Sequence, residues 1–498
     1  MALASDKAAR PRSKRVGAAS RSGTMAPHAK GADQHGGQFT PSSLESMRKD
    51  FDGNDAYRVA MNAVTQTAVD DVALSRSVVA GTDFSFSHRL DDWGVTHQKQ
   101  TGLCWIFAGL NLLRVGAMKR MNLDDFEFSQ NHILFWDKLE RSNYFLETII
   151  ATADLPTDDR AIDFLLSSPI ADGGQWNMFV NIVRRHGLVP KPLMPDTETS
   201  TNTRRMNSVL AHKLREGALV LRGLLSTGGS VEGARAAKRE LLSVIHRILC
   251  IHLGRPPMKV QWQWRDKKRK FHRDPAMTPQ EFARKYVTIP IDDYVCLVHD
   301  PRPTSLLERT FTVQYLGNMV GAGDVLYLNV EIGLMKRLAM NAIRCGEPVW
   351  MGCDVGQMMR RDLGVWDRNL YDFETLYNTA FSLNKAERLA YRESALTHAM
   401  LITGVDVIAQ RPRRWRVENS WGEEKSGRKG FFVMNDSWFD EYVFEVVVRR
   451  TVLSAALRDA LKTTPIVLPP WDPMGALARK HSSRQSPVDT EARTRLGE

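Results

Sequence analysis

Helix-forming sequence fills the first part of this chain and strand-forming sequence fills the last, and no other feature restricts the possible fold as much. Residues 44–79 and 104–118 are typical of helices, and residues 130–146 place apolar side chains near helical spacing. Residues 200–285 are rich in Leu, Ala, Arg and Lys with a helical period, and β-branched and aromatic residues become frequent from 287 to 330. The final part alternates as strands do, at residues 401–407, 414–418, 430–434 and 442–448. This order predicts an α+β fold with a helical insertion, and not a fold of alternating βαβ units.

Changes of composition predict five regions. The first forty residues hold seven Lys/Arg against two Asp/Glu, and the last twenty are polar and charged, so we expect both ends to be disordered. For the N-terminal tail, a solvated segment and an Arg-rich organelle transit peptide both fit this composition. The regions are a basic tail at 1–41, a helical lobe at 42–199, an insertion that is helical and then extended at 200–330, a β-rich lobe at 331–478, and a C-terminal extension at 479–498.

Hydropathy and cysteine usage exclude several classes of protein. No segment approaches the roughly 18 uninterrupted apolar residues that a membrane-spanning helix needs, so we expect no membrane association. The cysteines are few, odd in number and widely spaced, unlike those of secreted disulfide scaffolds or zinc sites. We therefore expect a reducing, cytoplasmic location and neither a metal nor a cofactor. The five are Cys104, Cys250, Cys296, Cys345 and Cys353.

The segment Gln98–Trp105 (QKQTGLCW) has the features of a nucleophile site. Gly102 permits a tight turn, and the apolar run that follows begins a helix at about Cys104. A thiol at a helix N-terminus lies in the positive end of the helix dipole, which favours the reactive thiolate. Cys104 is therefore the candidate nucleophile.

Two later segments supply the groups that such a thiol requires. His398 can take up the thiol proton and later protonate a leaving amine. Asn419 can accept a hydrogen bond from the other ring nitrogen, and the indole of Trp421 can shield that bond from water. The Gln98 amide and the Cys104 backbone N–H can stabilise an oxyanion. Taken singly, Cys104 and His398 would be read as core residues, but the combination favours catalysis.

These segments are similar to the local signature of papain-like cysteine peptidases, in which a Cys-Trp pair is followed by a distant His and Asn. The chain resembles, more closely, the bleomycin hydrolase or aminopeptidase C family within that superfamily. The resemblance extends over about residues 44–478 and rests on Ser129–Leu146, Asp172–Met178, Gly352–Gly356, Thr397–Gly404, Glu418–Gly422 and Ile466–Leu477.

The resemblance implies a papain-like two-lobed fold with a large, mainly helical insertion. It also implies a homohexamer with active sites facing an internal chamber, and a broad aminopeptidase acting on peptides and on amides such as that of bleomycin. Gly174 matches a family glycine that lets extended substrate approach, so Gly174 and Trp421 are candidate substrate-binding residues. Two features depart from papain itself: Thr101 replaces a cysteine, and His398 follows Cys104 by 294 residues.

The C-terminal extension leaves the mode of cleavage open. In the family the terminal carboxylate lies in the cleft and pairs with the amino group of the substrate. Here Arg479–Glu498 follow the segment after which relatives usually end. The chain is therefore expected to be an aminopeptidase, with an endopeptidase or a self-processing peptidase as alternatives.

A basic run suggests an alternative function of another class. Residues 265–272 (RDKKRKFH) follow Trp262 and Trp264, and mixtures of cations and aromatic rings suit single-stranded nucleic acids. A solvated face is the more usual explanation of such a run. Weak nucleic-acid binding is thus a second expectation beside peptidase activity.

Overall fold

The computed structural model describes residues 38–90, 93–424 and 426–478. Contacts within the chain define two compact units, one up to Ala68 and one from Val69 on. The boundary therefore divides the predicted helical lobe at 42–199, whereas the predicted regions at 200–330 and 331–478 lie in the second unit. Most of the predicted tails, at 1–41 and 479–498, lie outside the described residues. No helix in the described part of the chain combines the length and the apolar character needed to cross a membrane.

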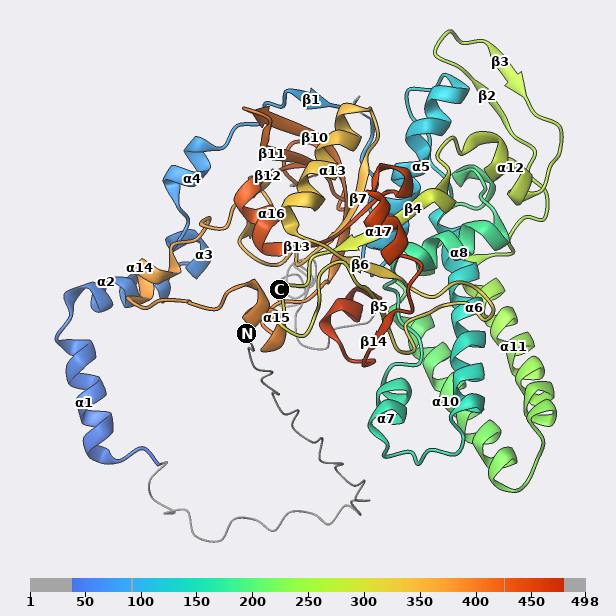
Figure 1. Ribbon diagram of the computed structural model, residues 1–498, viewed down its shortest axis with the longest axis horizontal. Helices are drawn as coiled ribbons and strands as arrows, with labels where there is room; N and C mark the ends of the chain where they lie inside the picture. Colours follow the sequence, from blue (N-terminus) through green and yellow to red (C-terminus); the bar gives the residue numbers. More distant parts are fainter. Residues whose placement is uncertain (1–37, 91–92, 425, 479–498) are drawn as a thin grey trace, which may run out of the picture. The chain divides into compact units, whose positions relative to one another are not determined.

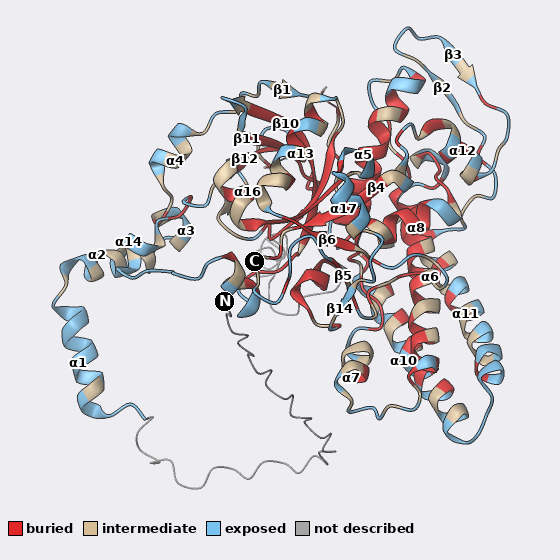
Figure 2. Cartoon of the chain, in the orientation of Figure 1, coloured by how far each residue is buried: buried red, intermediate tan, exposed pale blue. Residues whose placement is uncertain are grey.

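The predicted long helix over residues 44–79 is interrupted. Helix α1 (Pro41–Asp52) begins after the N-cap Thr40 and ends at Gly53, and Asn54 then caps α2 (Asp55–Val64). Each break coincides with a residue that caps helices better than it extends them. Neither α1 nor α2 buries a residue, and their ribbon in Figure 2 is pale blue and tan, without red. Two short helices follow in the second unit, α3 (Val69–Val72) and α4 (Arg76–Gly81).

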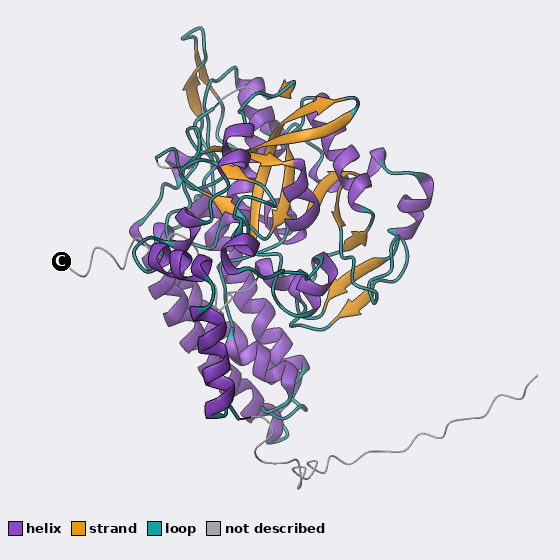
Figure 3. Ribbon diagram, turned by 90° about the vertical axis from the view of Figure 1, so that its left-hand side faces the viewer, coloured by secondary structure: helices purple, strands orange, loops and turns teal. Residues whose placement is uncertain are grey.

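The helical part of the second unit is built around α5 and α6. Helix α5 begins at Cys104, as predicted, and is buried on almost all sides, which fits its predominantly apolar sequence. Helices α6, α10 and α11 pack side by side as a bundle in Figures 1 and 3. The elements are α5 (Cys104–Met121), α6 (Gln130–Ala151), α7 (Arg160–Ser167), α8 (Trp176–His186), η1 (Lys191–Leu193), α9 (Glu198–Thr201), α10 (Arg204–Ser226), α11 (Val231–Leu253) and α12 (Pro279–Tyr286).

One twelve-stranded sheet forms the other part of this unit. Its strand order is β14-β5-β6-β4-β13-β7-β10-β11-β12-β9-β8, with β1 paired to β10. Strands from residues 294–329 thus belong to the same sheet as the β-rich C-terminal region. The strands are β1 (His88–Arg89), β4 (Tyr294–Val298), β5 (Thr310–Val313), β6 (Tyr327–Asn329), β7 (Val349–Cys353), β8 (Met359–Arg360), β9 (Val365–Trp366), β10 (His398–Ile408), β11 (Arg411–Glu418), β12 (Phe431–Asn435), β13 (Val443–Arg449) and β14 (Ile466–Leu468).

Helices cover both faces of this sheet. Helix α5 packs on β10 and β7, and α13 packs on β10 and β13. The buried residues are concentrated in α5, α6 and the central strands (Figure 2). The remaining elements are η2 (Ile291–Asp293), α13 (Ile332–Arg344), α14 (Phe373–Tyr377), α15 (Lys385–Ala390), α16 (Asp436–Tyr442), η3 (Arg450–Val452), α17 (Ala455–Ala460) and η4 (Pro473–Ala478).

A buried carboxyl in the central strand β13 accepts no hydrogen bond from nitrogen or oxygen donors of the described residues. Glu445 is fully buried, and burial raises the pKa of its carboxyl to about 8. The neighbouring Cys296 thiol is a weak donor and lies 3.3 Å from Asn177 Oδ1. The folded protein therefore holds a proton that the unfolded chain releases near pH 4.5.

We expect Glu445→Gln to stabilise the fold at alkaline pH. A carboxyl whose folded pKa is raised contributes stability below its unfolded pKa, and that contribution is lost as pH rises through about 8. The variant should be more stable than the wild type at pH 8.5 by about 1–3 kcal/mol, with a smaller difference at pH 5. Thermal unfolding of both proteins across this range measures the effect. Parallel stability curves would show that the carboxyl does not titrate in this window.

Candidate active site

The candidate nucleophile lies at the N-terminus of the central helix. Cys104 is the first residue of α5, after the N-cap Leu103, and is buried. The preceding Gly102 donates its N–H to the Asp172 carboxylate at 3.2 Å. A Cβ at Gly102 would lie 2.9 Å from Asp172 Cβ, so this close approach requires glycine. The turn that the sequence predicted before Cys104 is thus held by a second segment of the chain.

His398 and Asn419 lie at the ends of two paired strands. His398 opens β10, Asn419 follows the last residue of β11, and the two strands pair in antiparallel fashion. His398 Nε2 lies 3.0 Å from Asn419 Oδ1, which also accepts the Ser420 N–H at 2.8 Å. Since Oδ1 is an acceptor, Nε2 must donate, and Nδ1 is left as the nitrogen that can exchange a proton. The Trp421 ring lies 5.3 Å from the imidazole and is buried beside it.

The thiol and the imidazole approach the same place because α5 packs on β10. The backbone N–H groups of Ala399, the residue after His398, and of Trp105 lie close enough to the Cys104 sulfur to act on its thiol and lower its pKa. Cys353 of β7 pairs with His398 of β10, and its thiol lies near enough to Cys104 for the two thiols to interact. The structure therefore brings together three of the predicted site residues, Cys104, His398 and Asn419.

Burial decides the charge state of this pair. Burial raises the pKa of the Cys104 thiol to about 11, although the backbone N–H groups at the start of α5 act in the opposite direction. Burial also lowers the pKa of His398 to about 4, against the hydrogen bond to Asn419. The helix N-terminus favours the thiolate as predicted, but desolvation is the larger effect. Both groups are consequently neutral in this closed arrangement.

Gln98 lies against the turn that precedes Cys104. Its Oε1 accepts the Ser420 hydroxyl at 2.6 Å and its Nε2 donates to the Thr101 carbonyl at 2.6 Å. Its backbone N–H donates to the Ser420 carbonyl at 2.8 Å. An amide NH₂ carries two N–H groups, so one remains for another acceptor. Gln98 thus connects the loop before Cys104 with the Asn419–Trp421 segment.

Gly174 has a packing reason to be glycine. A Cβ at this position would lie 2.4 Å from Cε2 of the Trp105 indole. The same indole donates its Nε1–H to the Asp172 carbonyl at 2.7 Å. Gly174 therefore packs against the indole of Trp105, the residue that follows Cys104.

Two acids hold this site together, the buried Glu418 and the half-buried Asp172, and the sequence analysis assigned a role to neither of them. Glu418 accepts hydrogen bonds from Trp93 Nε1 (2.7 Å), Asn111 Nδ2 (2.8 Å) and Arg114 Nη2 (2.8 Å). Asn111 and Arg114 belong to α5, so Glu418 fastens the helix of Cys104 to the strand of Asn419. Glu418 is the only acidic residue in β11 (RPRRWRVE), and this single carboxyl beside four arginines was the signal available in the sequence.

Asp172 connects the turn before Cys104 with the helical insertion. Its carboxylate accepts hydrogen bonds from Lys138 Nζ (2.7 Å), Asn207 Nδ2 (2.6 Å) and the Thr203 hydroxyl. Burial opposes ionisation, but Lys138 and these hydrogen bonds hold the pKa of Asp172 well below its usual range. Asn207 lies in α10 and Thr203 just before it, so the helical insertion helps to hold the turn before Cys104.

The basic run forms part of a hairpin between β2 (Gln263–Arg265) and β3 (Phe271–Arg273). Trp264 donates its indole N–H to the Met121 carbonyl at 3.0 Å and stacks on His272. Trp262 is also half-buried and points its indole N–H at Met121 Sδ. Both indoles are thus occupied by packing, whereas Phe271 is exposed beside Arg265 and Arg273.

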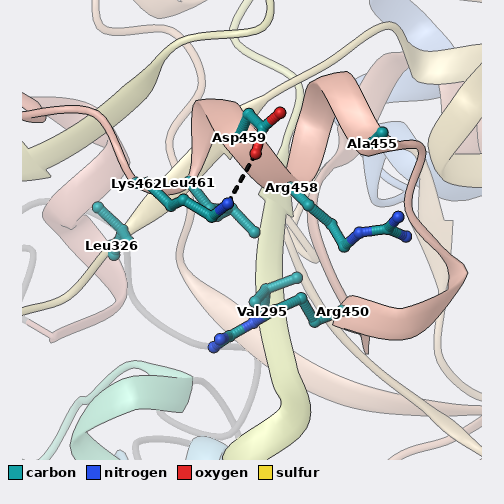
Figure 4. A pocket seen from close by; sticks show the side chains of 8 residues that line it. All are labelled: Val295, Leu326, Arg450, Ala455, Arg458, Asp459, Leu461 and Lys462. Atoms are coloured by element: carbon teal, nitrogen blue, oxygen red, sulfur yellow. Dashed lines mark hydrogen bonds and ion pairs between the residues drawn. The ribbon is translucent and has the colours of Figure 1, made fainter.

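A hollow of about 400 Å³ does not belong to this site. Figure 4 shows Arg450 and Arg458 extending away from the Asp459–Lys462 ion pair on its wall. No group of three or more potential metal ligands occurs within residues 38–90, 93–424 and 426–478. Residues lining the hollow are Val295, Leu326, Arg450, Ala455, Arg458, Asp459, Leu461 and Lys462.

Comparison with known proteins gives matches over most of the chain. The model of the Peptidase C1-like family matches residues 38–475. Aminopeptidase C of Lactobacillus delbrueckii subsp. lactis is 40% identical over 439 residues, which are 88% of this chain and 98% of that protein. Bleomycin hydrolase of Homo sapiens is 43% identical over 432 residues, 85% of this chain and 95% of that protein.

A solved structure matches the fold at similar identity. The crystal structure of PepW from Lactobacillus rhamnosis HN001 superimposes with a TM-score of 0.87 and 42% sequence identity. The match covers 88% of this chain and 99% of that chain. The predicted α+β, papain-like architecture is thereby confirmed.

Proposed function

The chain belongs to the Peptidase C1-like family, and on that premise we propose that it is a cysteine aminopeptidase of broad specificity. It removes N-terminal residues from peptides and, like the relatives named bleomycin hydrolase, acts on the amide bond of bleomycin. The observation that carries the proposal is the position of Cys104 at the head of α5, beside the hydrogen-bonded pair His398–Asn419. The names of the curated relatives favour this function over endopeptidase, self-processing and nucleic-acid-binding alternatives.

In the proposed reaction, His398 Nδ1 takes the proton of Cys104 and the sulfur attacks the substrate carbonyl. The new negative charge on oxygen is stabilised by the free N–H of the Gln98 amide and by the Cys104 backbone N–H. The imidazolium then gives its proton to the leaving amine, and an acyl-enzyme remains on Cys104. Water, deprotonated by His398, releases the acid product. Asn419 orients the ring throughout, and Gly174 and Trp421 border the substrate.

Proton transfer within the pair explains how neutral groups become reactive. Each charged form alone is disfavoured by burial, but thiolate and imidazolium formed together compensate each other. A substrate carbonyl that arrives near Gln98 accepts hydrogen bonds from the Gln98 amide and from the Cys104 backbone N–H. The pair therefore ionises in the complex with substrate, where the thiolate is needed.

The segment that precedes the C-terminal extension supports closure of one end of the cleft. Met474 and Leu477 of η4 are buried, and the Met474 carbonyl accepts the Tyr327 hydroxyl at 3.2 Å. Asp472 pairs with Arg302 at 3.0 Å, which fixes the start of this segment. The extension from 479 to 498 lies outside the described residues. We propose that a carboxylate near residue 478, exposed when the extension is removed, receives the substrate amino group.

The selectivity for a free amino group tests this function. An aminoacyl fluorogenic amide should be cleaved at least ~100-fold faster than its N-acetylated twin, since the acetyl group removes the charge and meets the closed end. Intact mass of the same preparation should show loss of residues 479–498. Equal cleavage of both substrates would identify an endopeptidase. Full-length mass with strict free-amine selectivity would mean that another anion holds the amine.

A cytoplasmic homohexamer is also proposed for this protein. Exposed apolar side chains on the long helices α10 and α11 support self-association, among them Leu219, Val220 and Ile251. Weak nucleic-acid binding by residues 265–272 has less support, because Trp262 and Trp264 pack against α5 and only Phe271 stays exposed.

A further inference from the structure

The indole of Trp421 has the catalytic imidazole on one side and a guanidinium on another. The ring of His398 lies 5.3 Å from it, and Arg361 Cζ lies 5.2 Å from its centre. Arg361 is held at this place, since its Nε donates to the Ser426 hydroxyl at 3.2 Å and its carbonyl accepts the Gly427 N–H at 3.0 Å. A fixed cation therefore lies one aromatic ring away from the catalytic base.

A second cation lies near the same segment. His97 packs against Gly422, where a Cβ would be 2.5 Å from His97 Cδ2, and its Nδ1 accepts the Lys99 N–H at 2.9 Å. Burial, followed by the positive charges of Lys99 and Arg361, lowers the pKa of His97 to about 4. Both charges that act on His97 are positive, although exposed Glu423 and Glu424 follow Gly422 in the chain. Lys99 and Arg361 thus create a positive field beside Trp421.

This positive field lies on the side of the leaving group. In the sheet, β7, β13, β4 and β6 extend from β10 in one direction, and Met474 of η4 is bound by Tyr327 of β6. Trp421 follows β11, which pairs with β10 on the opposite side. An aminopeptidase needs room for only one residue on the acyl side of the scissile bond. In the proposed arrangement, η4 closes the cleft beyond that residue. The remainder of the peptide must then extend over Trp421.

We propose that Lys99 and Arg361 form a subsite for the C-terminal carboxylate of short peptides. This inference rests on the proposed aminopeptidase function and specifies its substrate class. A guanidinium binds a carboxylate through two parallel hydrogen bonds, and an ammonium adds charge. The ring centres of His398 and Trp421 lie 5.3 Å apart, and Arg361 Cζ lies 5.2 Å from the Trp421 ring centre. An extended peptide spans about 3.3–3.6 Å per residue. Leaving groups of two to three residues place their carboxylate at this subsite.

The test compares a tripeptide acid, Ala-Ala-Ala, with its C-terminal amide, which differs only in the terminal charge. Release of the first alanine is followed by mass spectrometry. The wild type should hydrolyse the acid with a kcat/KM about tenfold higher or more, mainly through KM. Arg361→Gln and Lys99→Gln should each raise KM for the acid and leave KM for the amide unchanged. Arg361→Lys should keep part of the preference, and added salt should weaken it.

Arg450→Gln, at the separate hollow of Figure 4, is the matched control and should keep the preference. Equal kcat/KM for acid and amide in the wild type would overturn the subsite while leaving the aminopeptidase intact. The same holds if Arg361→Gln and Lys99→Gln raise KM equally for both peptides. If the wild type hydrolyses neither peptide nor the fluorogenic amide, the proposed function itself is wrong.

Discussion

Replacing Cys104 with alanine is expected to lower kcat for an aminoacyl fluorogenic amide by about 10⁵-fold, because no acyl-enzyme can form. The other members of the site act through this sulfur, so their presence cannot restore the rate. The fold should survive, since alanine fits the same helix and removes a single buried atom. Rates are measured with circular dichroism of the same samples. The same substitution should abolish alkylation of the active-site thiol by iodoacetamide.

Cys345→Ala provides the control for this prediction. Cys345 is an exposed cysteine at the C-terminus of α13, and its loss should leave the rate unchanged. Asn419→Ala should fall between the two variants, because the imidazole loses its orienting partner but keeps both nitrogens. Retained activity in Cys104→Ala would mean that another residue is the nucleophile.

Replacing Glu418 with alanine is expected to cost about 3–5 kcal/mol of folding stability. The change removes the acceptor of Trp93 and Asn111 and the close carboxylate partner of Arg114. The buried Arg114 guanidinium then keeps only the exposed Asp125 carboxylate, at 3.8 Å. Chemical denaturation of the wild type and the variant measures this loss. Activity should fall as well, since Glu418 joins the helix of Cys104 to the strand of Asn419.

Two companion variants decide whether the buried charge is the cause. Glu423→Ala removes an exposed carboxylate five residues away and should change stability by less than about 0.5 kcal/mol. Combining Glu418→Ala with Arg114→Met should recover part of the loss, because no unpaired charge then remains buried. A double variant as unstable as the sum of its single changes would assign the loss to packing.

Sequence patterns suggested candidate catalytic residues more easily than the groups that hold them in place. Cys104, His398 and Asn419 occur in short segments whose chemistry is recognisable locally, and α5 begins where its apolar run begins. The support from Glu418 and Asp172 depends on partners such as Arg114 and Asn207, which no local pattern connects to them. The predicted helix over 44–79 was wrong in its continuity, because Gly53 and Asn54 end one helix and cap the next.

The difference between what local sequence patterns predict and what tertiary contacts decide is also seen at Gly174 and in the helical insertion. The family resemblance suggested a substrate role for Gly174, whereas the structure adds a packing requirement from Trp105 that only the folded chain reveals. Helical spacing over residues 200–285 predicted α10 and α11 correctly, but it was wrong for residues 263–273, which form the β2–β3 hairpin. That Thr203 and Asn207 would hold Asp172, and through it the turn at Gly102, depends on tertiary contacts that periodicity does not contain.

The position of β13 in the sheet has a consequence for biosynthesis. This strand lies between β4 and β7, yet its residues 443–449 are among the last of the sheet to be translated. The two halves of the sheet cannot join while a ribosome is still producing the chain before this point. Cys104 also emerges 294 residues before His398 and 315 residues before Asn419, so the site cannot assemble until most of the chain has been made. A nascent peptidase of this design therefore cannot cleave other proteins until most of its own chain has been synthesised.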